Sequence, residues 1–120
     1  MEFNYTLDKK KKHTVVKLIG NLIAENQTTE LLNDIDEHIV DSFIYFVVDL
    51  SELDHMNSNG LNILINILTK SRNAGGETVI TGLSEKISKL IVITKLNTVF
   101  AIADNQEEAV GMFNKEESWL

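Results

Sequence analysis

The sequence predicts an α/β domain in which a mixed, mostly parallel β-sheet is covered by about four α-helices. After two opening strand-like segments, short apolar runs alternate with segments of helical spacing, and this alternation implies parallel strands joined by crossover helices. One run, Phe43–Leu50, has Asp49 as its only charged residue. A strand that is apolar on both faces belongs in the middle of a covered sheet. The chain of 120 residues has the length of one domain.

The first two strands are expected to form a hairpin. Phe3, Tyr5 and Leu7 alternate with polar residues, which is the pattern of a half-buried strand. The run Lys9–Lys12 follows, and a second strand, Thr14–Ile19, comes directly after it. An anion site is one interpretation of the lysines, but the flanking strands favour a solvated turn.

One helix is expected before the central strand in the chain, and another is expected after it. The first, Thr28–Val40, begins at a capping threonine. The second extends from Asn59 to about Ser71. Its apolar stripe consists of Leu61, Leu64, Ile65 and Leu68. Ile63 and Ile67 fall on nearly the opposite side beside asparagines, so we expect them to be exposed and to belong to a contact surface.

The last third of the chain repeats the alternation. A short strand is expected at Thr78–Thr81, a helix capped by Ser84, a last strand at Val99–Ile102, and a final helix that starts at Asn105. Residues 116–120 are expected to be a tail. The domain is thus predicted to cover residues 1–115, with residues 116–120 as the tail.

Composition excludes several classes of function. The net charge of −7 argues against a nucleic-acid or anionic-membrane partner, because both need a basic face. The absence of cysteine excludes disulfides and thiol chemistry. Neither a signal segment nor an apolar run of membrane-spanning length is present. We therefore expect a cytoplasmic protein with no membrane span and no cofactor.

The stretch from Asp49 to Leu61 joins the central strand to the second helix and reads as a short polar loop. It places the hydroxyl of Ser58 at the helix N-terminus, where backbone N–H groups lack intrahelical partners and the dipole favours negative charge. Two interpretations follow. Ser58 is a helix N-cap only, or it is a position where an added phosphate would meet the same donors.

The same stretch contains the residue types of a hydrolase, namely Asp49, Asp54, His55 and Ser58. It has no Gly-x-Ser-x-Gly pattern, and the charged residues are as easily explained as solvated loop positions. A metal site built from the three histidines is not expected either, because their spacing matches no ligand motif. The sequence favours a protein that is not an enzyme.

Residues 48–61 also carry a family resemblance. They read Val48-Asp49-Leu50-Ser51, then Leu53 and Met56, then Asn57-Ser58-Asn59-Gly60-Leu61. This resembles the STAS domain family of sulfate transporters and anti-sigma factor antagonists, in which a strand ending in Asp-Leu-Ser precedes Asp-Ser-Ser/Ala-Gly-Leu at a helix start. Asn73-Ala74-Gly75-Gly76 before a strand fits the same family. The resemblance covers nearly all of the chain and implies a STAS-like single domain.

In the antagonists of this family, the first serine of the Asp-Ser-Ser-Gly motif is phosphorylated by a partner. That partner is both an anti-sigma factor and a kinase with a histidine-kinase-like ATPase fold, and a PP2C-type phosphatase reverses the modification. The resemblance therefore implies phosphorylation at Ser58 and a bacterial transcription regulator that works by partner switching. The residues expected to bind the partner are Asn57, Ser58, Asn59, Gly60, Ile63 and Ile67.

The chain departs from the family pattern at three positions. Asn57 stands where the family has an acidic residue, Asn59 where it has a small one, and Asn21 where Glu or Asp is usual. Asn57 removes a charge from the kinase substrate motif. The alternative function is an accessory or scaffold subunit of a transporter or stressosome-like assembly, in which Ser58 need not be phosphorylated.

Overall fold

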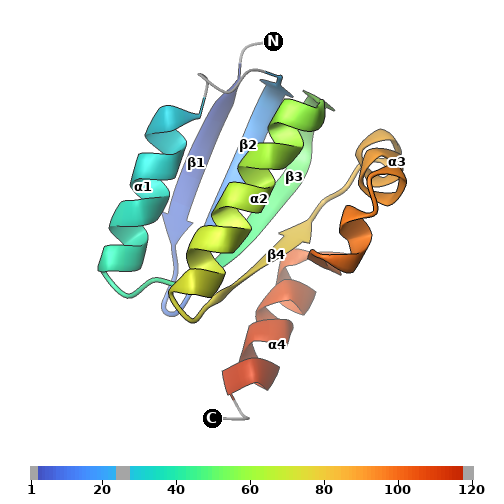
Figure 1. Ribbon diagram of the computed structural model, residues 1–120. Helices are drawn as coiled ribbons and strands as arrows, with labels where there is room; N and C mark the ends of the chain where they lie inside the picture. Colours follow the sequence, from blue (N-terminus) through green and yellow to red (C-terminus); the bar gives the residue numbers. More distant parts are fainter. Residues whose placement is uncertain (1–2, 24–27, 118–120) are drawn as a thin grey trace.

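A five-stranded sheet forms the middle of the domain (Figure 1). The computed structural model describes residues 3–23 and 28–117, and side chains as far as residue 113. The elements in chain order are β1 (Asn4–Lys9), β2 (Thr14–Leu22), α1 (Thr29–Val40), β3 (Tyr45–Met56), α2 (Ser58–Asn73), β4 (Glu77–Thr81), α3 (Glu85–Ile93), the 3-10 turn η2 (Leu96–Thr98), β5 (Ala101–Ala103) and α4 (Gln106–Glu117). The predicted alternation of strands and helices is confirmed.

The strands lie side by side in the order in which they occur in the chain, β1-β2-β3-β4-β5. β1 pairs with β2 in antiparallel orientation, and the other three pairs are parallel. The lysine run forms the β1–β2 turn, where the Lys10 N–H donates to the His13 carbonyl at 2.8 Å. The sheet is therefore mixed and mostly parallel, as predicted.

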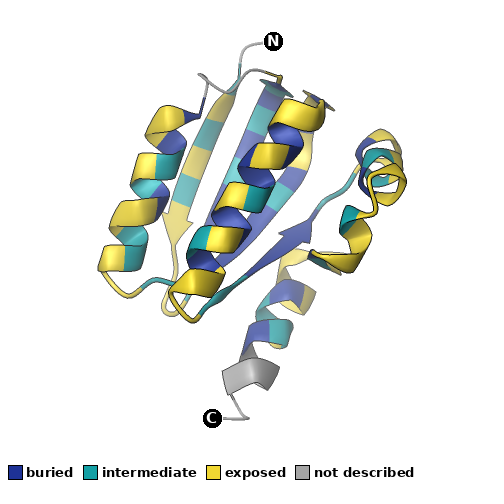
Figure 2. Cartoon of the chain, viewed as in Figure 1, coloured by how far each residue is buried: buried dark blue, intermediate teal, exposed yellow. Residues whose placement is uncertain are grey.

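The two faces of the sheet carry different cores. Successive strand residues point to opposite faces, so Val16, Val48 and Ile80 face one side while their chain neighbours Val15 and Val47 face the other. The first group belongs to the larger cluster, which α1, α2 and α3 complete. The second group packs with Ala109 and Phe113 of α4, which lies behind the sheet in Figure 1. β3 is therefore buried on both faces along Phe46–Val48 (Figure 2).

Several element boundaries differ from the prediction, and three of these differences change the description of the fold. β3 continues to Met56, so the residues expected to form a polar loop after Leu50 are mostly strand. The reason is that Leu53 and Met56 remain buried while two register shifts against β2 turn the polar residues outward. The last strand is Ala101–Ala103, because η2 precedes it. α4 continues to Glu117, which takes residues 116 and 117 out of the expected tail; residues 118–120 lie outside the described residues.

The expected exposure of Ile63 and Ile67 is wrong. Their exposed fractions are 3% and 0%, and both belong to the larger core cluster. The buried side of α2 is rotated from the predicted stripe toward Ile63 and Ile67. Ile65, which belonged to that stripe, is only partly buried. The helix is covered by the sheet beneath it and by α1 beside it, so one narrow stripe underestimates its buried surface.

Ile67→Ala should destabilise the domain by about 2–5 kcal/mol, because it removes a fully buried side chain from a packed core. Chemical denaturation measures the loss. The exposed neighbour Asn66 provides the matched control, since Asn66→Ala should change stability by no more than about 0.5 kcal/mol. A loss at Ile67 as small as that at Asn66 would contradict the assignment of Ile67 to the core.

His13 lies at the edge of the smaller core cluster, the one that packs against α4. Its ring centroid is 6.3 Å from that of Phe113, and its Nε2 atom is buried without a hydrogen-bond partner among the described residues. Burial is the main cause that lowers the pKa of His13 below its usual 6.5, and the nearby Lys10 ammonium adds to this effect, while Asp8 opposes it. The folded protein therefore holds His13 neutral more strongly than the unfolded chain does.

Stability should fall as the pH drops below about 6.5, because the unfolded chain then binds a proton at His13 more readily than the folded domain. Above that pH both states are neutral at His13 and the effect is absent. Denaturation of wild type and His13→Gln between pH 7.5 and about 5 tests this. The His13→Gln variant should lose less stability than wild type as the pH falls through this range. His38→Gln, which removes a histidine from α1, is the control. Parallel curves for wild type and His13→Gln would refute the prediction.

Candidate functional site

A single residue, Asn57, joins the end of β3 to the start of α2. It has extended backbone angles, and its Oδ1 accepts a hydrogen bond from the Gly60 N–H at 3.2 Å. Its carbonyl accepts from the Leu61 N–H at 3.0 Å, which is the first helical hydrogen bond. Asn57 is thus the N-cap, and the interpretation of Ser58 as the cap is wrong. Asparagine caps a helix as well as aspartate does, so the departure from the family pattern leaves the helix start intact.

Ser58 is the first residue of α2 and is exposed. Its hydroxyl makes no hydrogen bond within the described part of the chain. No acidic residue lies in the first turn of the helix. Because Asn57 takes the capping role, the Ser58 hydroxyl is available to a partner or to a modifying enzyme.

The two asparagines that flank Ser58 attach it to the end of β2. Asn57 Nδ2 and Asn59 Nδ2 both donate to the Ile23 carbonyl, at 3.2 and 3.3 Å. Ile23 itself is 48% exposed. Asn57 and Asn59, two of the three departures from the family pattern, therefore have a structural role here, because they hold the first turn of α2 against Ile23, the residue that follows β2.

Gly60 allows this close approach. A Cβ atom at this position would lie 2.6 Å from the Leu22 carbonyl oxygen and 2.4 Å from Met56 Cγ. Both distances are shorter than real Cβ atoms tolerate, and the carbonyl belongs to the backbone. Gly60 is buried, so it positions the site by packing and does not present a surface to a partner.

The structure brings together some of the expected partner-binding residues and separates others. Asn57, Ser58 and Asn59 are exposed at one corner of the domain. Ile63 and Ile67 are excluded from the surface by burial. The exposed residues that continue from Ser58 along α2 are Asn62 and Asn66. Sequence reasoning missed them because it assigned the contact role to the apolar residues beside them.

The hydrolase residues do not assemble into a catalytic triad. His55 Nδ1 lies 3.0 Å from Lys86 Nζ, and Asp49 Oδ1 accepts from the Ser51 N–H at 2.9 Å. Neither group bonds to Ser58, although a serine nucleophile needs a base within hydrogen-bond reach. Among the described residues, no group of three or more His, Asp and Glu side chains gathers in a way that could hold a metal ion. In the same part of the chain, none of the helices combines the length and the apolar character needed to cross a membrane.

Comparisons with known proteins agree with this fold. The STAS domain family model matches residues 4–109, and the chain belongs to this family. An anti-sigma-B factor antagonist of Listeria monocytogenes is 31% identical over 64 residues, which are 53% of this chain and 56% of that protein. The chain thus spans about half the length of the curated relatives it matches.

Solved structures share the fold across nearly the whole domain. An anti-sigma factor antagonist from Mycobacterium paratuberculosis has a TM-score of 0.77 at 21% identity, covering 94% of this chain and 95% of that one. The Bacillus cell fate determinant SpoIIAA in its phosphorylated form has a TM-score of 0.70 at 18% identity, covering 91% and 98%. At these identities the likeness establishes the fold alone.

Asn57→Ala should destabilise the domain by about 0.5–2 kcal/mol through loss of the N-cap. Asn57→Asp should retain most of the stability, because a carboxylate also accepts from the Gly60 N–H. Chemical denaturation of both variants measures the difference. Asn62→Ala, an exposed residue of the same helix, is the control and should be close to wild type. An alanine variant as stable as the aspartate variant would argue against Asn57 as the cap.

Proposed function

We propose that this protein is an anti-sigma factor antagonist that regulates bacterial transcription in the cytoplasm by partner switching. It binds an anti-sigma factor through the Ser58 end of α2, and phosphorylation of Ser58 by that partner releases it. The carrying observation is the exposed Ser58 hydroxyl, without a hydrogen bond in the described residues, at the start of a helix anchored in the core. Membership of the STAS family and the similarity to named antagonists support the same function.

The surface around Ser58 suits a neutral, hydrogen-bonding interface. Asn57, Ser58 and Asn59 form its centre, and Asn62 and Asn66 extend it along α2. These side chains offer donors and acceptors without a charge to desolvate. The exposed Ile23 beside them adds apolar area. Such a surface can bind when Ser58 is unmodified.

Phosphate would change this surface sharply. It adds about −1.5 to −2 units of charge at pH 7, and an unpaired charge is costly to bury in an interface. Within the domain the same phosphate is tolerated, because the first N–H groups of α2 and the helix dipole favour an anion and no acidic residue lies in the first turn. The switch therefore acts between molecules and leaves the fold of this domain unchanged.

The partners follow from this function. The kinase is the anti-sigma factor itself, with a histidine-kinase-like ATPase fold, and a PP2C-type phosphatase restores the unmodified serine. The protein acts as a binding module and not as an enzyme. The similar Bacillus structure in a phosphorylated form supports the idea that this fold accommodates a phosphate.

Ser58→Asp should weaken binding to the cognate anti-sigma factor at least tenfold, which corresponds to about 1.4 kcal/mol, and leave the melting temperature nearly unchanged. Ser58→Ala should bind constitutively, with the stability of wild type, since Ser58 is not the cap. Calorimetric binding and thermal melting on the same proteins measure both effects. Protein phosphorylated at Ser58 should be included, because aspartate mimics phosphate imperfectly.

The exposed Ser51 of β3 provides the matched control, because Ser51→Asp adds the same charge away from α2. It should bind like wild type. Mass spectrometry after incubation with the kinase and ATP should find one phosphate, at Ser58. Modification at Ser51 alone, undiminished binding of the phosphorylated protein, or co-purification with a transporter subunit in place of an ATPase would each count against the proposal.

A further inference from the structure

An exposed apolar side chain, that of Ile23, lies beside the proposed binding surface at Ser58. Ile23 directly follows β2, whose last residue, Leu22, is in register with Met56, the last residue of β3. Only Asn57 separates Met56 from Ser58. The end of β2 therefore brings an apolar side chain, 48% exposed, to a surface made of serine and asparagine side chains.

Two side-chain amides hold the backbone of Ile23 in place. Asn57 Nδ2 and Asn59 Nδ2 donate to the same acceptor, the Ile23 carbonyl oxygen, at 3.2 and 3.3 Å. A carbonyl oxygen has two lone pairs, so it can accept both hydrogen bonds at once. The two amides and this carbonyl form what we call the asparagine clamp. Because the two donors flank Ser58 in the chain, the clamp fixes Ile23 relative to the serine.

The clamp is distinct from the N-cap of α2, although the two share Asn57. Asn57 Oδ1 accepts from the Gly60 N–H, which leaves Nδ2 as the group that donates to the Ile23 carbonyl. A carboxylate at this position could accept from Gly60 but has no donor for the carbonyl. Asn59 lies within the first turn of α2, and its amide contributes to the clamp without contributing to the cap.

A fixed apolar side chain contributes more to binding than a mobile one does. Ordering a residue during association costs conformational entropy, which weakens the complex. The clamp restricts the backbone of Ile23 already in the free domain, so less of that cost arises when a partner binds. Binding energy in protein interfaces is concentrated in a few buried anchors with polar contacts around them. Ile23, with asparagines beside it, has the surroundings of such an anchor.

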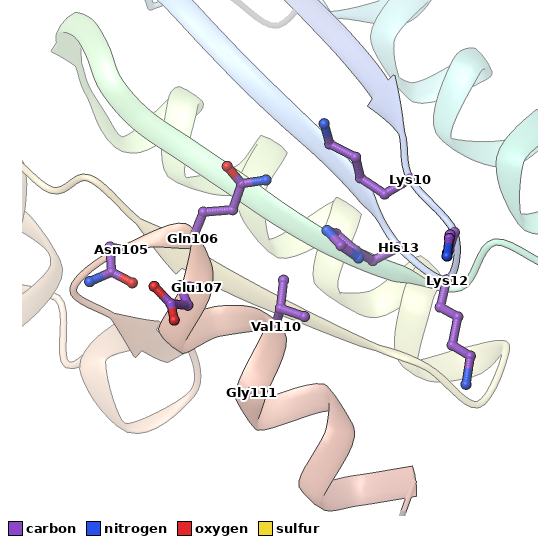
Figure 3. A pocket seen from close by; sticks show the side chains of 9 residues that line it. Lys10, Lys12, His13, Asn105, Gln106, Glu107, Val110 and Gly111 are labelled. Carbon is purple, nitrogen blue, oxygen red and sulfur yellow. The ribbon is translucent and has the colours of Figure 1, made fainter.

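A larger cleft in the described part of the chain does not adjoin this surface. It has a volume of about 1090 Å³ and lies between the β1–β2 turn and the start of α4 (Figure 3). Lys10, which lines it, is ion-paired with Asp8 at 2.7 Å, and Glu107 lines it from the first turn of α4. α4 covers the face of the sheet opposite α2. The cleft therefore lies away from Ser58, whereas Ile23 adjoins it.

We propose that Ile23 is the apolar anchor of the interface with the anti-sigma factor, and that Asn57 and Asn59 are the positioning residues that hold it there. The partner surface has an apolar recess that receives the Ile23 side chain, next to polar groups that bond to Ser58 and the asparagines. This inference rests on the proposed function, because it describes how the partner binds the same site.

Ile23→Ser should weaken binding of the unphosphorylated protein to the cognate anti-sigma factor about tenfold. The substitution removes the apolar side chain but leaves the backbone carbonyl, so the clamp is retained. Val40→Ser is the matched control and should bind like wild type, because Val40 is 83% exposed at the end of α1, before the start of β3, while Ser58 follows the end of β3. Thermal melting verifies folding. Equal affinities of Ile23→Ser and wild type would overturn the anchor.

A double-mutant cycle tests whether the clamp acts through the anchor. Asn59→Ala removes one of the two donors and should weaken binding about threefold. In the Ile23→Ser background the same substitution should have little further effect, because there is no apolar side chain left to position. Losses that simply add would show that Asn59 contacts the partner directly, and its positioning role would be refuted.

The clamp also has a readout that needs no partner. By ¹⁵N relaxation of the free full-length protein, the Ile23 amide should have the order parameter of rigid backbone, about 0.85, and a lower value in Asn59→Ala. Asn62→Ala, at an exposed position of the same helix, should leave it unchanged. An Ile23 order parameter that is equal in Asn59→Ala and wild type would overturn the clamp, whatever the partner.

The two proposals fail in different ways. If phosphorylation of Ser58 releases the partner while Ile23→Ser binds normally, the anchor is refuted and the proposed function stands. If binding does not respond to phosphorylation of Ser58 but is weakened by Ile23→Ser, the switch is refuted and the anchor is supported.

Discussion

The burial of β3 on both faces is the constraint on which the rest of the structure depends. Val47 and Val48 point to opposite sides of the sheet and belong to different core clusters. A strand in this situation needs a helical layer on each side. Its carboxyl end is fixed as well, because Met56 is buried next to Leu22 of β2. Since only Asn57 separates Met56 from α2, the core determines where Ser58 lies.

Strand order then decides which face each helix covers. The parallel strands follow one another in chain order, and crossover connections between parallel strands are right-handed in nearly all proteins. Helices that connect strands while moving in one direction across a sheet must therefore lie on the same face. This explains why α1, α2 and α3 share the larger core, while α4, which follows the last strand, is free to cover the other face.

The fold could be predicted from the sequence because strong local patterns agreed with it. The apolar run Phe43–Leu50, most of which lies in β3, and the capping residues Ser84 and Asn105 report local preferences that the tertiary structure respects. The extension of β3 could not be read from its polar residues, since bulges against β2 set which of them turn outward.

The site was predictable in location but not in detail. Ser58 follows from the motif, whereas the choice of Asn57 as cap depends on one backbone conformation. The prediction that Ile63 and Ile67 are exposed was wrong. A helix that packs on both a sheet and another helix buries a wider part of its surface than one apolar stripe suggests.

The unequal covering of the two faces has a consequence for how the chain tolerates shortening. Val15, Val47 and Val79 lie in register on three adjacent strands, and Phe113 and Ala109 of α4 cover that surface. A chain cut before α4 would keep every residue around Ser58 but expose a row of β-branched side chains, the kind of surface through which sheets self-associate. The last helix thus covers an apolar face of the sheet, and the proposed binding surface on the opposite side depends on that cover without touching it.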